Sequence, residues 1–267
     1  MAIRIYAGKE IEKIQAAGEI AYKTHMHLAK FLKEGISTGE LDELARDYIN
    51  SFGAEAAFLG FHGFPAHICT SVNDVVVHGI PDRQVKLKNG DIIGIDIGVK
   101  YLDYYADTAW TWPIGEVSEA DKKLIEYTQK SLHQGIKEAV VGNRIGAIGA
   151  AVQETAEKHG FSVVRTLVGH GVGKSIHEEP QVPNFGKRKN GALIRAGMVL
   201  AIEPMINEGA YDVYTDNDHW AVRTRDGKKS AHFEHTIAIT AVGPKICTLP
   251  ENSETNVFII LQGNSKD

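Results

Sequence analysis

Apolar residues recur along this chain with two periods, one typical of helices and the other of strands. A spacing near 3.6 residues predicts helices over residues 10–33, 40–52, 119–140 and 146–159. Runs rich in isoleucine, valine, tyrosine and tryptophan predict strands over residues 66–77, 91–112, 162–169, 197–208, 219–225 and 231–241. No low-complexity linker interrupts the pattern, and only a short turn near residues 113–115 divides it. We therefore expect one α+β domain that covers residues 1–267.

A weak repeat at an offset of 107 residues divides this domain into two halves. The glycines that recur are Gly35, Gly39, Gly53 and Gly90, matched by Gly142, Gly146, Gly160 and Gly197. The segment KNGDIIGIDIGV matches RAGMVLAIEPMI at the same offset and aligns Asp96 with Glu203. Glycine is common here, but several aliphatic positions and a carboxylate at one offset exceed coincidence. The repeat predicts two lobes, residues 1–113 and 114–267, with Asp96 and Glu203 facing each other across a pseudo-twofold axis.

Acidic side chains stand inside several of the apolar, strand-like runs. They are Asp96 in IIGIDIGV, Asp107 in YYADTAW, Glu203 in VLAIEPMI and Glu234 in AHFEHTIAI. Burying an unpaired carboxylate costs several kcal/mol or more, so such groups are paired, neutralised or bound to metal. No lysine or arginine lies inside these segments. The missing positive charge therefore predicts a metal site.

A histidine completes the candidate ligand set. His170 lies in GHGVG after a strand-like run, and its flanking glycines leave room for a ligand to come close. One imidazole with four carboxylates suits manganese, iron or cobalt better than a structural zinc site. Four negative charges balance two divalent ions, an arrangement that recurs in hydrolytic enzymes. His78 in VVVHGIP and His177 in GKSIHEEP could steady an oxyanion or transfer a proton, although a lone histidine is more often structural.

Composition narrows the class of protein further. The formal net charge of −5 gives no support to a nucleic-acid binder, and Lys187, Arg188 and Lys189 form the only tight basic cluster. The two cysteines, Cys69 and Cys247, exclude a disulfide framework and fit a reducing compartment. No apolar run approaches the roughly 20 residues needed to span a bilayer. We expect a cytoplasmic protein without membrane or direct nucleic-acid contacts.

The motifs together resemble the methionine aminopeptidases, in the single-domain type I form found in bacteria. The matching segments are ICTSVNDVVVHGIPD, GDIIGIDIGV, YYADTAW, GHGVGKSIHEEPQVPNFG, GMVLAIEPMI and HFEHTIAIT. The resemblance implies the two-lobed "pita-bread" fold. It also implies a metal-dependent aminopeptidase that removes the N-terminal methionine when the next residue is small, with a bridging hydroxide attacking the first peptide bond. Only 33 positions separate His170 from Glu203, which leaves no room for the helical insertion of type II enzymes.

The resemblance also implies a role for each site residue. Asp96, Asp107, His170, Glu203 and Glu234 would hold two divalent ions, drawn from cobalt, manganese, iron, zinc and nickel, with Asp107 and Glu234 bridging them. Glu203 would also transfer the proton. His177 would hydrogen-bond the scissile carbonyl, and His78 would lie near the amide nitrogen of the bond that is cut.

A pocket for the methionine side chain should be apolar and able to hold a thioether. By family position its residues would be Phe61, His62, Phe64, Cys69, Ile176 and Trp220. Members of the family often carry an aromatic residue in place of Ile176, and tyrosines in place of Phe61 and Phe64. The pocket is therefore expected to be roomier or less polar here. An acidic cluster between Tyr211 and Lys229 is interpreted as a solvated loop.

Two other functions are compatible with the same fold. An X-Pro-type peptidase would resemble this chain less at GHGVGKSIHEEP, and a non-catalytic binding protein would have lost metal ligands. The expected partners are a peptide or nascent-protein substrate and a transient ribosome contact, and we expect a monomer.

Overall fold

The computed structural model describes residues 2–250, 253 and 256–263. Within that part of the chain the α-helices are α1 (Gly8–Leu28), α2 (Thr38–Asn50), α3 (Glu119–Glu138), α4 (Ile145–Lys158) and α5 (Val257–Gly263), with a 3₁₀ turn η1 (Phe61–Gly63). Helices α2 and α3 begin at capping boxes, in which Ser37 pairs with Glu40 and Ser118 with Asp121. None of the described helices is long and apolar enough to cross a membrane.

The strands form four sheets and come from both halves of the chain. The first half supplies β1 (Glu55–Ala56), β2 (Cys69–Val72), β3 (Val75–Val77), β4 (Ile92–Tyr101) and β5 (Tyr104–Pro113). The second half supplies β6 (Ser162–Val163), β7 (Val168–Gly171), β8 (Glu178–Pro183), β9 (Val199–Ile202), β10 (Met205–Asn207), β11 (Val213–Thr215), β12 (Val222–Thr224), β13 (Ser230–His232), β14 (His235–Thr240) and β15 (Gly243–Ile246).

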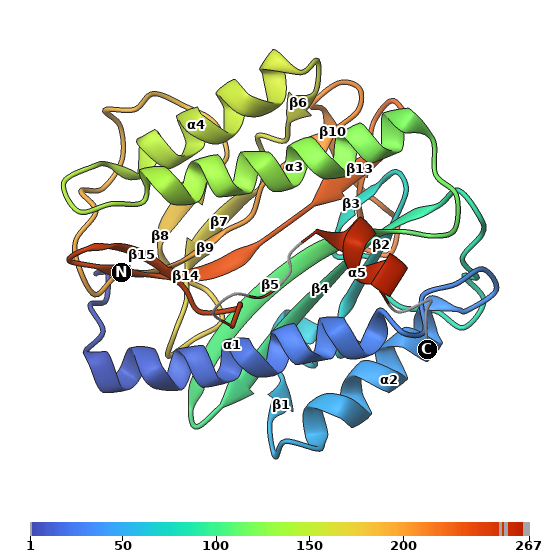
Figure 1. Cartoon of the computed structure of the whole chain (residues 1–267), viewed down its shortest axis with the longest axis horizontal. Coiled ribbons are helices and arrows are strands. Elements are labelled where there is room, and N and C mark those ends of the chain that lie inside the picture. Colours follow the sequence, from blue (N-terminus) through green and yellow to red (C-terminus); the bar gives the residue numbers. More distant parts are fainter. Residues whose placement is uncertain (1, 251–252, 254–255, 264–267) are drawn as a thin grey trace.

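One larger sheet belongs to each half. The first has the order β1-β4-β2, with β5 paired to β4, and the second has the order β15-β14-β9-β7-β8. Two smaller sheets, β13-β10-β6 and β11-β12-β3, accompany them, and the β12–β3 pair joins the two halves. Strands β5 and β14 run side by side near the centre of the molecule (Figure 1).

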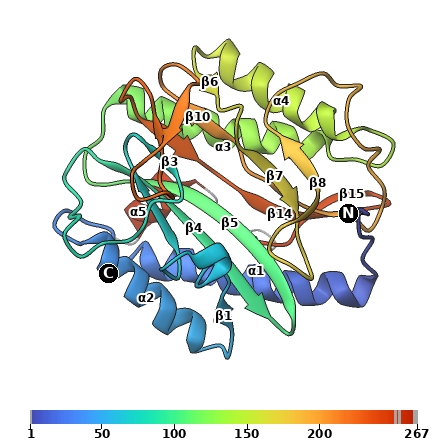
Figure 2. The same ribbon diagram turned by 180° about the vertical axis from the view of Figure 1, so that it is seen from behind.

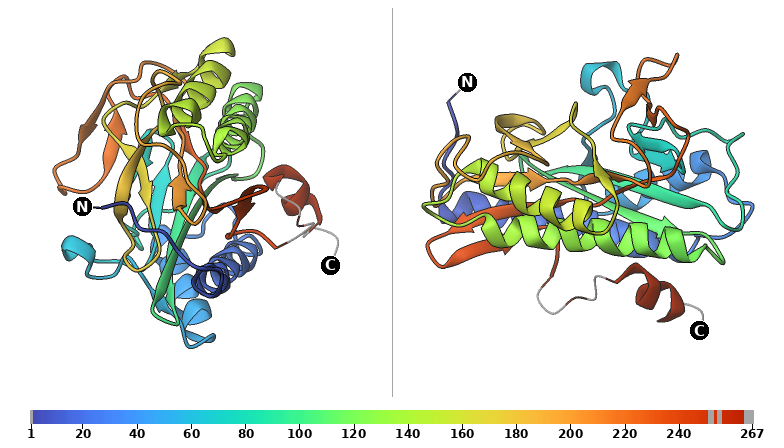
Figure 3. Two further views of the ribbon diagram at one scale, coloured as in Figure 1. Left: turned by 90° about the vertical axis from the view of Figure 1, so that its left-hand side faces the viewer. Right: turned by 90° about the horizontal axis from the view of Figure 1, so that it is seen from above.

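The helices cover one side of these sheets. Helix α1 packs on β4 and β5, whereas α3 packs on α4 and on strands of the second half. Seen from behind, the strands face the viewer and the helices lie beyond them (Figure 2). The right-hand view of Figure 3 shows α3 and α4 on one side of the strands and the β11–β12 hairpin (orange) projecting from the other. The main buried cluster, which includes Ile14, Trp110, Leu132 and Ile202, draws on both halves.

The repeat at an offset of 107 reappears in the backbone. Gly35 and Gly142 both take positive φ, +89° and +95°, and donate their N–H groups to the carbonyls of Leu87 and Ile194. Isolated bridges join Ser37 to Lys86 and Arg144 to Leu193, again 107 residues apart. The α+β architecture with two related lobes is therefore confirmed.

Several predicted elements are wrong in extent. The helix predicted over 10–33 ends at Leu28, because Phe31 and Leu32 pack on the core from a turn. The run 91–112 is a hairpin, β4–β5, that turns through two residues with positive φ, Leu102 and Asp103. The predicted strands 66–77 and 162–169 are each two short strands, and 219–225 is a strand only over β12.

The strands predicted over 197–208 and 231–241 are also broken, and each break falls at an acidic residue of the site. The first break is at Glu203–Pro204, where proline has no N–H for strand pairing, and the second is at Phe233–Glu234. The segment interpreted as a solvated loop is also structured. It forms the β11–β12 hairpin, held by ion pairs from Arg223 to Asp74 and Asp216.

Candidate metal centre

The four acidic residues predicted from the apolar runs and His170 meet at one place. Asp96 and Asp107 lie on the paired strands β4 and β5, and His170 lies on β7. Glu203 and Glu234 lie in the two strand breaks. Their ligand atoms form overlapping groups, each within 4.8 Å: Asp96, Asp107 and Glu234 in one, and His170, Glu203 and Glu234 in another. Residues up to 138 positions apart in sequence thus share one site.

The tautomer of His170 leaves a lone pair directed at this cluster. Its Nδ1 lies 2.9 Å from the Gly171 carbonyl oxygen, which accepts only if Nδ1 carries the proton. Its Nε2 is then unprotonated and lies 3.4 Å from Glu203 Oε1 and 3.9 Å from Asp107 Oδ2. Burial, followed by the charge of His177, lowers the pKa of His170 to about 3, so the ring is neutral near pH 7. A neutral imidazole oriented by a backbone carbonyl is the usual state of a metal-binding histidine.

The four carboxyl groups resist ionisation in the absence of a cation. Burial raises the pKa of Asp107 to about 7. Burial and then the charge of Asp107 raise the pKa values of Asp96, Glu203 and Glu234 well above their ordinary range. Desolvation and mutual repulsion act in the same direction, because each penalises the charged form.

Unpaired oxygen atoms show that the carboxyl groups fit a metal ion. Asp96 Oδ1, Asp107 Oδ1 and Glu234 Oε1 are buried and have no hydrogen-bond partner. In the described part of the chain no lysine or arginine lines the cavity around them. Buried charges need pairing or coordination, so a divalent cation is the partner that this oxygen-rich donor set with one imidazole accommodates.

The glycines beside His170 serve a different purpose from the one predicted. A Cβ on Gly169 would collide with the Ala201 carbonyl oxygen, and one on Gly171 would collide with the Glu179 carbonyl oxygen. The prediction that these glycines leave room for a ligand is therefore wrong, because the neighbouring strands occupy the space that their side chains would take. The space is filled by the backbones of β9 and β8, which pack against both sides of the strand that carries His170.

Two further imidazoles border the cluster. The ring centroid of His177 lies 4.2 Å from that of His170, and burial lowers the His177 pKa to about 4. His78 has a φ of +60°, a left-handed conformation that is uncommon for a residue other than glycine. Burial also lowers the pKa of His78. Both rings are therefore neutral near pH 7, and each offers one N–H donor.

A cavity of about 250 Å³ is lined by the four carboxylates and His170 together with apolar side chains. Its walls hold the predicted residues Phe61, His62, Phe64, Cys69, His78, His177 and Trp220. The indole of Trp220 stands edge-on to Phe64, with ring centroids 5.1 Å apart. Burial raises the pKa of the Cys69 thiol well above its usual range, so this side chain lines the cavity as a neutral group.

Ile176 is not among the residues that line this cavity. It is buried in the apolar cluster of Phe58, Phe64 and Cys69. Phe58 does line the cavity, and sequence reasoning missed it because AAFLGF reads as ordinary core.

His232 is a second residue near the site that sequence reasoning missed. Its Nε2 is buried without a hydrogen-bond partner and lies 3.7 Å from Glu203 Oε2. The signal was its place two positions before Glu234 in AHFEH.

A second cavity of about 400 Å³ continues from the first and shares His78, His170, His177 and Glu203 with it. Its other walls include Leu167 and Met205. A chain whose first side chain occupies the apolar cavity can therefore continue into the second one, past the carboxylates.

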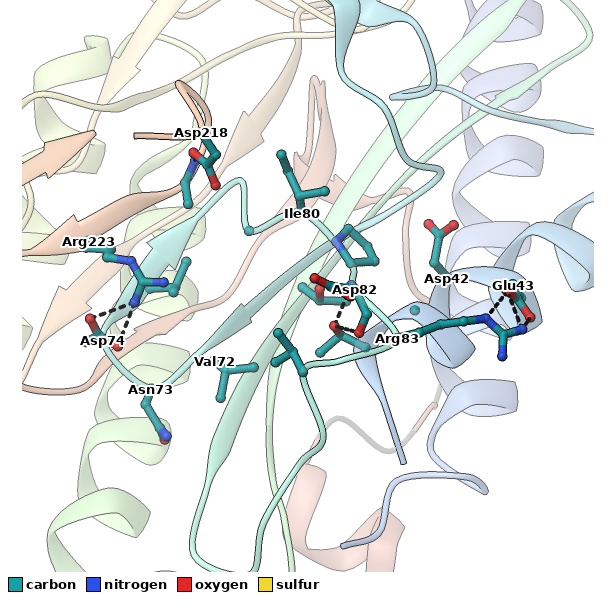
Figure 4. Close-up of a pocket in the computed structure, with 18 residues that line it drawn as sticks. Asp42, Glu43, Val72, Asn73, Asp74, Ile80, Asp82, Arg83, Asp218 and Arg223 are labelled. Atoms are coloured by element: carbon teal, nitrogen blue, oxygen red, sulfur yellow. Dashed lines mark hydrogen bonds and ion pairs between the residues drawn. The ribbon is translucent and has the colours of Figure 1, made fainter. Parts of the chain in front are cut away.

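A larger cavity, of about 860 Å³, lies elsewhere, between α2 and the β2–β3 hairpin. Its two guanidinium groups are already paired, Arg83 with Glu43 and Arg223 with Asp74 (Figure 4). It shares no lining residue with the metal-site cavity, so its size does not make it the reactive site.

Comparison with known proteins agrees with this geometry. Residues 12–241 match the family described as metallopeptidase family M24. Methionine aminopeptidase 1 of Bacillus subtilis is 51% identical over 90% of this chain and 96% of its own. The crystal structure of methionine aminopeptidase from Thermotoga maritima has a TM-score of 0.92 and 40% identity, over 93% of this chain and all of that one.

A prolidase from Pyrococcus horikoshii shares the fold less closely. Its TM-score is 0.75 at 24% identity, over 92% of this chain and 64% of its own. These likenesses identify the two-lobed architecture as the pita-bread fold. The X-Pro-type alternative is not favoured. By sequence, by fold and by the divalent-metal chemistry of its donor set, the chain belongs to metallopeptidase family M24 and, within it, to the methionine aminopeptidases.

Proposed function

We propose that this protein removes the N-terminal methionine from peptides and nascent proteins when the second residue is small. The observation that carries the proposal is that a carboxylate–imidazole cluster and a set of apolar side chains line one cavity of about 250 Å³. Phe64, Cys69 and Trp220 offer the apolar and polarisable surface that a thioether prefers.

The residues that would hold two divalent ions in this proposal are Asp96, Asp107, His170, Glu203 and Glu234, and Asp107 and Glu234 would contribute to the binding of both ions. When bound, such ions lower the pKa of a water molecule towards 7 and polarise the substrate carbonyl. We propose manganese, iron, cobalt, zinc or nickel as the ion, since oxygen ligands and one imidazole accept each of them.

The remaining work belongs to side chains of this chain. Glu203 takes the proton of the attacking water on a carboxylate oxygen and delivers it to the leaving nitrogen. The neutral ring of His177 donates its N–H to the carbonyl oxygen, where negative charge develops. His78, at the junction of the two cavities, holds the amide nitrogen of the bond that is cut. Phe61, His62 and the apolar wall around Phe64 hold the first side chain, with Ile176 supporting that wall from behind.

Peptide turnover tests this function directly. Metal-stripped protein should release no methionine from Met-Ala-Ser, and adding manganese or cobalt should restore release. Glu203→Ala should remain inactive under both conditions while keeping the circular dichroism of the wild type. An Ala-Pro peptide serves as the control substrate for the X-Pro alternative. Folded protein that releases no methionine with any of these ions would leave a non-catalytic binding protein as the better description.

We further propose that residues 1–267 form one catalytic domain that works as a monomer in the cytoplasm, with transient ribosome contact. The buried, free thiols of Cys69 and Cys247 support a reducing location. Sedimentation of the purified protein, alone and with ribosomes, tests the monomeric state and the ribosome contact.

A further inference from the structure

Two buried threonines join the strands that carry Asp107 and Glu234. In the described structure β5 pairs only with β4, and β14 pairs only with β9 and β15, so no backbone ladder links β5 to β14. The two segments nevertheless lie side by side (Figures 1 and 2). Thr108 and Thr236, both fully buried, supply much of the connection between them.

The hydroxyl of Thr236 satisfies both backbone groups of Asp107. It donates to the Asp107 carbonyl oxygen at 2.8 Å and accepts from the Asp107 N–H at 2.9 Å. A hydroxyl can do this because it is one donor and two acceptors at a single atom. The Asp107 backbone is thereby held by a residue only two positions after Glu234.

The contact is reciprocal. The hydroxyl of Thr108, next to Asp107, donates to the Glu234 carbonyl oxygen at 2.7 Å. The Glu234 N–H donates to the Ala109 carbonyl oxygen at 2.7 Å. The backbone of Thr108 is also contacted by α1, where His25 Nε2 lies 3.2 Å from the Thr108 carbonyl oxygen. The backbone of each carboxylate residue is therefore fixed by the segment that carries the other.

We propose that Thr108 and Thr236 are positioning residues that set the separation of the Asp107 and Glu234 carboxylates, and with it the affinity of the second metal ion. This inference rests on the proposed metal site. Ladder hydrogen bonds between β5 and β14 would hold the two segments at the usual distance between paired strands. The threonine hydroxyls instead allow Glu234 to remain in a strand break and still face Asp107. Threonine suits the task because its β-branched side chain has few rotamers.

The variant Thr236→Val tests the proposal, because valine matches threonine in shape but has no hydroxyl. We expect titration calorimetry with manganese to show the second ion binding about 10–100-fold more weakly, as is typical when groups that orient ligands are lost. The EPR signal of the manganese-loaded protein should change as well. Thr236→Ser, which keeps the hydroxyl, should restore affinity to within about threefold of the wild type.

Kinetics distinguish positioning from substrate contact. Neither threonine lines the cavities around the metal site, so Thr236→Val should lower kcat for Met-Ala-Ser while leaving KM nearly unchanged. Thr128→Val is the matched control. Thr128 is also fully buried, but its hydroxyl donates within α3, to the Leu124 carbonyl oxygen, so its loss should not change metal binding.

Several outcomes would overturn the proposal. Wild-type metal affinities and an unchanged EPR signal in Thr236→Val would do so, and so would a serine variant as impaired as the valine variant, since packing would then be responsible. If Thr236→Val does not fold, Thr108→Val, which leaves one acceptor unpaired, provides the same comparison. Wild-type protein that binds two ions without cleaving peptide would contradict the proposed function alone. Protein that binds no divalent ion would contradict both.

Discussion

At the scale of single residues, Asp107 and Glu234 combine deep burial with a cavity in which, among the described residues, no lysine or arginine lines the wall. Asp107 and Glu234 are 3% and 2% exposed, and the charges of Asp107, Glu203 and Asp96 act on Glu234. Such a cluster is costly in a protein without metal, because each ionised group is both desolvated and repelled by its neighbours. The site therefore reduces stability in the metal-free state and increases it when a cation binds.

The first prediction follows from this conflict. Glu234→Gln replaces a carboxyl group, whose pKa is raised in the folded state, with a neutral amide of the same size that has no ionised form to desolvate. We expect the metal-free variant at pH 8 to melt a few degrees above the metal-free wild type, since about 1 kcal/mol shifts the melting temperature of a domain this size by roughly 2–4 °C. The gain should shrink at pH 5, where the wild-type carboxyl groups are largely protonated.

Bound metal should reverse this order of melting temperatures between the variant and the wild type. In excess manganese the wild type should melt above the variant, and peptide release by the variant should fall by about 100-fold or more, since a ligand matters at least as much as the groups that orient it. Glu12→Gln, at an exposed position on α1, is the control and should change neither quantity. A metal-free Glu234→Gln protein less stable than the wild type at pH 8 would contradict this account.

At the scale of secondary-structure elements, close backbone approach determines where His170 lies. Strand β7 is sandwiched between β9 and β8, and neither flanking glycine has space for a Cβ. A longer side chain at either position must push a neighbouring strand away. The position of the His170 imidazole therefore depends on the register of three strands, β7, β8 and β9.

Gly171→Ala should therefore affect both stability and the site. The added methyl group meets backbone atoms of Glu178 and Glu179, which have no rotamer to change. Overpacking of this kind costs about 1–3 kcal/mol. We expect a lower melting temperature and weaker manganese binding, measured by calorimetry, because His170 moves with β7.

Gly8→Ala is the matched control for this substitution. Gly8 is the first residue of α1, and a Cβ there meets nothing within 4 Å, so stability should be unchanged or slightly raised. Equal metal affinity in Gly171→Ala and the wild type would show that β7 tolerates the displacement.

At the scale of the whole molecule, the metal centre lies where the two lobes meet, and metal binding therefore stabilises the complete fold. Asp96 and Asp107 come from the first half, and His170, Glu203 and Glu234 from the second. An ion that binds only the folded state raises stability in proportion to the logarithm of its concentration over its Kd.

The stabilisation by metal should depend on pH. The pKa of Asp107 is raised from 3.8 to about 7 by burial. The stability linked to this raised pKa is fully present below about pH 4 and is lost from the metal-free protein as pH rises through about 7. Metal needs the deprotonated ligands, so its affinity increases over the same range.

The difference in melting temperature between manganese-loaded and metal-free protein should therefore widen from pH 5 to pH 8, by roughly 5 °C or more. Scanning fluorimetry on dialysed protein at several pH values measures it, and effects common to both samples cancel. A difference that stays constant or narrows with pH would show that the carboxylates do not govern stability.

The sequence predicted much of the fold, and the failures have physical causes. Helices α2, α3 and α4 were found within about two residues because amphipathic spacing and end signals agree there. The strand breaks at Glu203 and Glu234 were missed because a continuous apolar run looks the same whether its strand is continuous or broken. Phe58 was missed because a core residue and a cavity-lining residue obey the same local pattern, and His232 was missed because its place near Glu203 depends on strand packing.

The sequence by itself determined which carboxylates were candidates for one site, since carboxylates within apolar runs are costly wherever those runs are buried. It also determined the two related halves, because glycines that must take positive φ recur at one offset. Only the tertiary structure decided which atoms meet. The lone pair of His170, the unpaired oxygens of Asp96 and Asp107, and the threonine contacts between β5 and β14 all depend on strand packing across the two lobes. Local pattern cannot specify such contacts, because they join residues far apart in sequence. They also change when one strand shifts along another by less than the length of one residue.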